Sequence, residues 1–326
     1  MTRKKGVMEI ELARSVLEQI SALDLTEKVT FHVMGEPLLH PNFFEILDFA
    51  QQKGLKVGLT TNGGLLNSDS IKRLADRDLH QIDISLQTPD RESFEATRGA
   101  RVDFDKYCEN LLELMAACAA RTSPPIFKIR FMTTRFAGKM TKHLGIPNFM
   151  KTTGELHRNI LRWTERVCFR LGRPIPDDLP QRIRKIGICG WNVIEISPKI
   201  YFETYVLTDW GNAFAPDGVV EVNRGYCFGM RDHFGILYSG DVVLCCVDFD
   251  GKTSIGNLKE SSLLDILSGS RLKKIMSGFA TGRLVEPYCR HCLGSSTRLG
   301  ALIKPAASLM GLKVLKPFFY RKYRLF

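Results

Sequence analysis

The chain has 326 residues, of which 44% are hydrophobic and 25% are charged. That balance is typical of a globular protein, and the length is enough for one large core and a smaller appended domain. No run of roughly 18 to 20 apolar residues is present for a membrane span, and Glu9 and Glu11 stand where a secretory signal would be apolar. We therefore expect a cytoplasmic protein rather than an exported one.

The first half of the chain alternates helix and strand. Apolar residues recur with a helical period in 8–23, 43–50, 68–75 and 104–119, while residues 28–33, 55–61, 81–87 and 126–133 have the pattern of strands. This alternation predicts an α/β fold with a parallel sheet and outer helices. In such folds the functional residues collect at the carboxyl ends of the strands.

Three polar clusters follow three successive strands. They are Gly35-Glu36-Pro37, Thr60-Thr61-Asn62-Gly63 and Ser85-Leu86-Gln87-Thr88-Pro89. Each alone is also typical of a simple turn, but their recurrence at three neighbouring strand ends predicts one functional edge.

With Met34 before the first cluster and the sequence FEATRG at residues 94–99, these motifs resemble the radical S-adenosylmethionine (radical SAM) superfamily over residues 1–135. The resemblance implies a partial (β/α)6 TIM-like barrel that lacks its first strand here. It also implies that Gly35, Glu36 and Pro37 bind the amino group of S-adenosylmethionine (SAM), with the Glu36 carboxylate accepting from the ammonium. Further cofactor contacts are implied for Ser85, Gln87, Asn62 and Arg98, the last as a partner of the SAM carboxylate. No catalytic acid or base is assignable.

Radical SAM chemistry also needs a 4Fe-4S cluster on a Cys-x3-Cys-x2-Cys loop, and the first cysteine of this sequence is Cys108. Either the recorded chain is truncated before its cluster loop, or the protein is a degenerate member that has lost its redox centre. Retention of Glu36, Asn62 and Ser85 together favours truncation. We expect the radical SAM cluster only if an upstream cysteine loop exists.

The second half carries four cysteines spaced like metal ligands: Cys227, Cys245, Cys289 and Cys292. Gly240-Asp241 between apolar runs predicts a hairpin that presents Cys245, and Cys-x2-Cys is a common chelating pair. Spacing alone does not separate zinc from an iron-sulfur cluster. The stretch is similar to the SPASM extension of radical SAM enzymes in its shortened, twitch-like form, which implies one auxiliary 4Fe-4S cluster. The adjacent Cys246 is the alternative to Cys245.

The middle and the end of the chain are basic. Residues 135–190 interrupt the alternation with a basic amphipathic helix, either a solvated surface helix or a contact for an anionic partner. Residues 193–207 then return to the core as a strand region. The net charge is +11, and residues 293–326 hold seven Lys or Arg and no acid: Arg298, Lys304, Lys313, Lys316, Arg321, Lys322 and Arg324. Because no nucleic-acid module surrounds them, we expect membrane association rather than nucleic-acid binding.

The expected organisation is a radical SAM core at 1–215 with the basic helical insertion at 135–190, a SPASM/twitch domain at 216–297 and a basic aromatic tail at 298–326. The resemblance implies an oxidoreductase or maturase that cleaves SAM reductively and abstracts hydrogen from a peptide, protein, sugar or alcohol. It implies an electron donor such as flavodoxin or ferredoxin. The alternative is a non-catalytic iron-sulfur or zinc binding protein with a basic docking tail.

Overall fold

The computed structural model describes residues 3–98, 102–134, 149–206, 212, 218–227, 229 and 232–311. They form two compact units, Thr26–Asp209 on the one hand and Met1–Leu25 with Trp210–Phe326 on the other. The residues before the first strand thus group with the C-terminal unit, a division that differs from the core boundary expected at residue 215.

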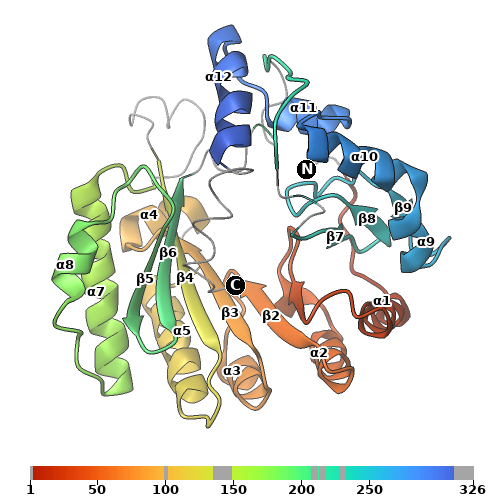
Figure 1. Cartoon of the computed structure of the whole chain (residues 1–326). Helices are drawn as coiled ribbons and strands as arrows, with labels where there is room; N and C mark the ends of the chain where they lie inside the picture. The colour runs from red at the N-terminus through yellow and green to blue at the C-terminus, as the bar shows by residue number, and fades with distance from the viewer. Residues whose placement is uncertain are drawn as a thin grey trace. The chain divides into compact units, whose positions relative to one another are not determined.

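The unit Thr26–Asp209 is built on a six-stranded sheet (Figure 1). The strands are β1 (Lys28–Phe31), β2 (Lys56–Thr61), β3 (Gln81–Gln87), β4 (Ile126–Thr133), β5 (Asn192–Ser197) and β6 (Ile200–Val206), in the order β1-β2-β3-β4-β6-β5. All neighbouring pairs are parallel except β5 and β6. The parallel α/β fold expected from the alternation is confirmed.

Helices connect the parallel strands of this unit (Figure 1). They are η1 (Pro37–Leu39), α2 (Phe43–Gln52), α3 (Ser68–Ala75), α4 (Arg91–Arg98), α5 (Phe104–Ala119), α7 (Thr153–Leu171) and α8 (Leu179–Arg184). Asn67 and Thr152 begin α3 and α7 with capping boxes that satisfy the first backbone amides. Such local signals explain why these helices begin where they do.

The two faces of the sheet differ in chemistry because successive strand residues point to opposite sides. Leu59, Ile84 and Phe131 belong to the apolar set, and each is fully buried. The other face carries charged residues in register across three strands, with Asp83 opposite Lys128 and Arg130 opposite Glu203. Asp83, Lys128 and Glu203 are themselves buried, so these charges lie in the interior of the unit.

The basic helix at 156–171 is part of α7, which lies in the chain between β4 and the β5–β6 pair. Leu156, Ile160, Trp163 and Val167 are fully buried, whereas Arg158, Arg162 and Arg170 are exposed. The amphipathic pattern is confirmed. Since α7 also contacts α5, it continues the helix layer of the repeat rather than standing apart as an insertion.

The strand region expected at 193–207 is two strands instead of one. β5 and β6 pair antiparallel around a turn at which Lys199 has a φ of 64°. Only β6 pairs with β4. The pattern of apolar residues continues through both strands, so the turn between them could not be predicted from periodicity alone.

The second unit holds α1 (Ile10–Ala22), β7 (Gly235–Ile236), β8 (Asp241–Val243), β9 (Gly256–Asn257), α9 (Leu263–Ser268), α10 (Ser270–Thr281), α11 (Pro287–Cys292) and α12 (Arg298–Ser308). The Gly-Asp hairpin is confirmed as β7 and β8, with Gly240 at a φ of 95°. Residues 312–326, most of the basic tail, lie outside the described residues. None of the helices in the described ranges is long and apolar enough to cross a membrane.

Candidate functional site

Glu36 lies at the carboxyl end of β1, where it precedes η1, and its carboxylate connects two strand ends. Oε1 accepts hydrogen bonds from the Thr61 hydroxyl at 2.8 Å and from the Leu38 amide at 3.2 Å. Oε2 accepts from the Asn62 amide at 2.7 Å. The Glu36 side chain is therefore fixed against the end of β2.

This arrangement leaves room for one more donor. An ionised carboxylate has about four acceptor positions, and three protein groups occupy three of them. The neighbouring Gly35 is exposed, and a Cβ added there would meet no atom within 4 Å. A cationic donor can thus approach Glu36 past Gly35 and find its carboxylate already oriented.

The Asn62 turn is held in place by two side chains from other helices. The carbonyl of Asn62 accepts from Arg98 Nη1 at 2.8 Å and from the Tyr107 hydroxyl at 2.9 Å. Burial raises the pKa of Tyr107 far above its ordinary value, so the hydroxyl remains a donor. Gly63 has a φ of 75°, and a Cβ there would stand 3.0 Å from the Tyr107 ring.

Arg98, for which the resemblance implies a contact with the SAM carboxylate, donates to two backbone carbonyls of the chain. Besides Asn62, its guanidinium donates through Nη2 to the Ser85 carbonyl at 2.6 Å. Arg98 therefore links the ends of β2 and β3 through their backbones. Ser85 and Gln87 are both half-buried at the end of β3, where Gln87 has a φ of 62° and the pairing with β4 shifts register.

An ion network lies on the polar face of the same sheet. Arg130 donates through Nε to Glu203 at 2.6 Å and lies with Nη2 3.0 Å from Asp83. Trp191 Nε1 donates to Glu203 Oε1 at 2.9 Å. Gln81 Nε2 donates to Asp83 Oδ1 at 2.7 Å. The two acids hold the pKa of Arg130 above its ordinary value although burial acts against them.

His32, four residues before Glu36, faces this network. Burial lowers the pKa of His32, and the charge of Arg130 lowers it further, while Asp83 opposes both. Its Nδ1 atom is buried with no hydrogen-bond partner among the described residues. The imidazole is therefore kept neutral beside a network of charges.

The four cysteines of the second unit share one neighbourhood. Cys289 and Cys292 lie one turn apart on α11, and Cys245 follows β8. Burial raises the pKa of Cys245 to about 12, and Cys227 acts on it in the same direction. Burial likewise raises the pKa of Cys289, and the charges of Cys227, Cys245 and Cys292 raise it further. Because charges act on a thiol most strongly at short range, Cys227, Cys245 and Cys292 lie near Cys289.

Buried thiols can act as metal ligands, because a bound metal ion favours the thiolate that burial disfavours. Within the described ranges, no three His, Cys, Asp or Glu side chains are close enough to hold a single metal ion. One tetrahedral zinc requires sulfurs about 3.8 Å apart, from Zn–S bonds of about 2.3 Å. A 4Fe-4S cluster binds each cysteine sulfur to a different iron, so it accommodates cysteine sulfurs that are farther apart.

Polar contacts of Asp248 and Asn212 support the cysteine segments. Fully buried Asp248 accepts from the Thr253 hydroxyl at 2.6 Å and from the Lys252 amide at 2.9 Å, which closes the loop after Cys245. Asn212 Nδ2 donates to the Gly294 carbonyl at 2.7 Å, just past the end of α11. Gly229 also lies against Cys245, because a Cβ there would stand 3.3 Å from the Cys245 Cβ.

The structure brings together Glu36, Asn62, Ser85 and Arg98 at one edge, as expected from the sequence. Two further residues of this edge had no assigned role. Thr61 is the strand residue directly before Asn62, so its position was a usable signal. Tyr107 lies 45 residues after Asn62, and no local pattern connects them.

Two family models match ranges of this chain. Residues 1–123 match the model of the radical SAM superfamily, and residues 227–293 match the SPASM model, described as an iron-sulfur cluster-binding domain. The family expected from the motifs is confirmed.

Among curated proteins, the antilisterial bacteriocin subtilosin biosynthesis protein AlbA of Bacillus subtilis is 25% identical over 184 residues, 50% of this chain and 41% of that protein. Mycofactocin maturase MftC of Mycobacterium ulcerans is 38% identical over 101 residues, 30% of this chain and 26% of that protein. The matched segments thus span less than half the length of each of these relatives.

A solved structure of Streptococcus suis SuiB shares the fold. Its TM-score is 0.50 at 17% identity, and the match covers 85% of this chain and 63% of that chain.

Proposed function

We propose, because this chain belongs to the radical SAM superfamily and carries a SPASM domain, that it binds SAM at the edge formed by Glu36, Asn62 and Ser85. The observation that carries this proposal is the Glu36 carboxylate, held by Thr61 and Asn62 with one acceptor position left. The ammonium of SAM would occupy that position in a charge-assisted hydrogen bond. Gly35 leaves the approach open, and Pro37 begins the 3-10 turn that fixes Glu36.

The roles of the other edge residues follow from their partners. Arg98 and Tyr107 fix the Asn62 turn, and Arg98 also holds the end of β3 from which Ser85 and Gln87 would contact the ribose. Arg98 would thus contribute to SAM binding indirectly, by fixing the backbone at the ends of β2 and β3. When bound and reductively cleaved, SAM supplies the radical that abstracts hydrogen from a substrate.

The second part of the proposal is one auxiliary 4Fe-4S cluster on Cys227, Cys245, Cys289 and Cys292. The electrostatic coupling of the four thiols and the match to the SPASM domain support it. Cys245 is preferred to Cys246 because Cys245 is half-buried and the charge of Cys227 raises its pKa, whereas Cys246 is exposed. Four protein ligands leave no open iron, so the cluster would relay an electron or support the fold.

For the substrate we propose a peptide that is matured by hydrogen abstraction. The names of two relatives, a bacteriocin biosynthesis protein and a maturase, support this class over a sugar or an alcohol. A flavodoxin or ferredoxin would supply the electron.

The decisive experiment measures 5′-deoxyadenosine by mass spectrometry after anaerobic cluster reconstitution and dithionite reduction. It compares the printed chain, which contains no Cys-x3-Cys-x2-Cys, with the protein made from the same gene and its in-frame upstream codons. We expect the product only from a protein that carries this motif. Upstream DNA without those codons would favour the alternative, a non-catalytic binding protein.

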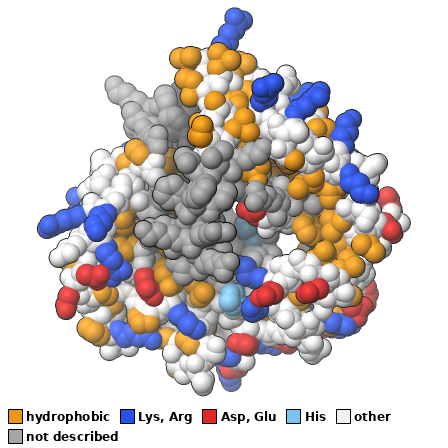
Figure 2. All heavy atoms as spheres, in the orientation of Figure 1, with side chains coloured by type: hydrophobic (Ala, Val, Ile, Leu, Met, Phe, Trp, Pro, Cys, Tyr) orange, Lys and Arg blue, Asp and Glu red, His pale blue; other side chains and the backbone are white. Residues whose placement is uncertain are grey.

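Helix α12 favours one further role, contact with an anionic membrane surface. Leu299, Leu302 and Ile303 are 67%, 74% and 58% exposed, and Figure 2 shows apolar side chains gathered over this helix. The charged residues within α12 are Arg298 and Lys304, and the sequence beyond it has no acid. An exposed apolar face with basic residues is the composition of interfacial helices.

Vesicle co-sedimentation tests this role with phosphatidylserine and phosphatidylcholine. We expect binding to the anionic vesicles only, and at least a fivefold loss in the double variant L302Q/I303Q. Binding that persists unchanged in this variant would exclude α12 as the contact.

A further inference from the structure

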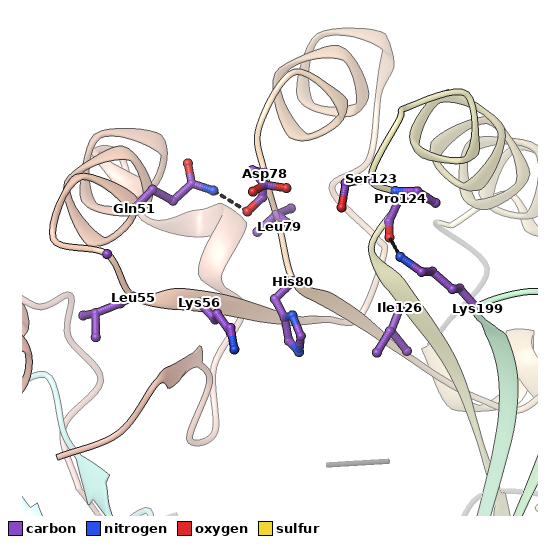
Figure 3. Close-up of a pocket in the computed structure, with 11 residues that line it drawn as sticks. Gln51, Leu55, Lys56, Asp78, Leu79, His80, Ser123, Pro124, Ile126 and Lys199 are labelled. Atoms are coloured by element: carbon purple, nitrogen blue, oxygen red, sulfur yellow. Dashed lines mark hydrogen bonds between the residues drawn. The ribbon is translucent and has the colours of Figure 1, made fainter. Parts of the chain in front are cut away.

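A pocket of about 410 Å³ lies at the amino-terminal ends of β2, β3 and β4, in the unit Thr26–Asp209. The candidate cofactor residues lie at the opposite, carboxyl ends of these strands, so the pocket is a separate site. Its lining includes Lys56, Asp78, His80, Ile126 and Lys199. Figure 3 shows the side chains of Lys56, His80 and Ile126 directed to the same side of the strands.

The amines at this pocket have donors to spare. Lys56 Nζ lies 2.6 Å from Glu27 Oε2, and Lys199 Nζ donates to the Pro124 carbonyl at 2.8 Å. A lysine ammonium has three donors, so among the described residues each retains two. Both amines are therefore able to bind a ligand without giving up the protein contact described for them.

Positive charge exceeds negative charge around His80. Lys28, Lys56 and Lys199 act on the imidazole from β1, β2 and the β5–β6 turn, and Asp78 is the acid that acts on it. Asp78 is itself 3.9 Å from the guanidinium of Arg121, and Glu27 is paired with Lys56. Burial first and then these three lysines lower the pKa of His80, while Asp78 opposes them.

We propose that this pocket binds a small anionic ligand of the phosphate or sulfate ester class, with Lys56 and Lys199 on the anionic group and His80 as a third donor. The volume is in the range of small-molecule sites. Lysines bind such groups as point charges. An anion here also favours the protonated imidazole, so ligand binding and proton uptake by His80 are linked. This inference is independent of the proposed SAM chemistry.

The test uses sodium sulfate as the probe, because sulfate remains a dianion throughout pH 5.5–8. The His80 ring resonances of the full chain are followed by NMR during sulfate titrations at constant ionic strength in chloride. We expect saturable shifts, at least threefold tighter binding at pH 6 than at pH 8, and a higher pKa of His80 with sulfate bound. K56Q and K199Q should each weaken binding at least fivefold, whereas K72Q, on the exposed side of α3, should leave it unchanged.

A second variant protects the test against misfolding. H80Q, in which sulfate binding is followed by the backbone amide resonances because the His80 ring is absent, should retain binding at pH 8 and lose the tightening at pH 6. The same amide spectrum shows that the fold is intact. The proposal is overturned if sulfate gives no saturable shift at His80, or if folded K56Q and K199Q bind it as tightly as K72Q.

Discussion

The Thr61 hydroxyl lies 2.8 Å from Glu36 Oε1, and this hydrogen bond joins the ends of two neighbouring parallel strands. Thr61 also accepts from the Gly63 amide at 3.0 Å, so one side chain connects Glu36 to the Asn62-Gly63 turn. Thr61 therefore fixes the Glu36 carboxylate, which would receive the ammonium, relative to the Asn62-Gly63 turn.

Removing this connection should loosen the site without removing its charge. In T61V the Glu36 carboxylate keeps two of its three donors, so we expect SAM to bind about three- to tenfold more weakly, as for the loss of one hydrogen bond of about 1 kcal/mol. Isothermal titration at constant pH measures this, with E165Q on the exposed side of α7 as the control. Wild-type affinity in T61V would show that Thr61 does not position Glu36.

The cysteine assignment predicts which thiols hold iron. Serine at Cys227, Cys245, Cys289 or Cys292 should each reduce the iron and acid-labile sulfide content by more than half after anaerobic reconstitution. C246S and C189S, at exposed positions, should retain wild-type content and the absorbance near 400 nm. Loss of the cluster in C246S but not in C245S would reverse the choice between the neighbours, and stoichiometric zinc without sulfide would contradict the cluster itself.

Breaking the Arg130 network should be costly because it leaves two buried carboxylates without their shared cation. Asp83 and Glu203 are 4% and 5% exposed. We expect R130M to lower the free energy of unfolding by about 3–5 kcal/mol, measured by urea denaturation. R162M, at an exposed position on α7, should change it by less than about 0.5 kcal/mol. Equal effects would mean that the network contributes nothing specific.

The buried imidazole of His32 makes stability depend on pH. Its pKa in the folded protein is below the ordinary value of 6.5 because of burial and then Arg130, with Asp83 and a Gly35 backbone contact opposing. The unfolded chain therefore takes up the proton first, and stability is lost as pH falls through 6.5. We expect the difference in unfolding free energy between wild type and H32Q to decline from pH 7.5 to 5.5. A difference that stays constant would show that His32 is solvated.

Much of the fold was predictable because local signals agree with it. The helix at 68–75 and the strands at 81–87 and 126–133 have the bounds expected from periodicity. The three polar clusters do meet at one edge, because the carboxyl ends of parallel strands must lie side by side.

The remainder depends on contacts that no local pattern contains. The helix α1 groups with the C-terminal unit, where Gln19 accepts from the Leu263 amide at 2.6 Å and Glu9 pairs with Lys259 at 3.1 Å. These partners are more than 240 residues apart. The contacts of Arg98 with two backbone carbonyls could not be predicted either. A sequence does not show whether a cationic side chain will contact a ligand or another part of the chain.

We propose above all that Glu36 receives the ammonium of SAM. Saturation-transfer difference NMR detects weak binding and measures it directly for wild type, E36Q and the control E165Q. We predict that SAM binds wild type and E165Q alike and binds E36Q about 10- to 100-fold more weakly, as for the loss of a charge-assisted hydrogen bond of about 1.5–3 kcal/mol. Equal affinity of E36Q and wild type would contradict the account.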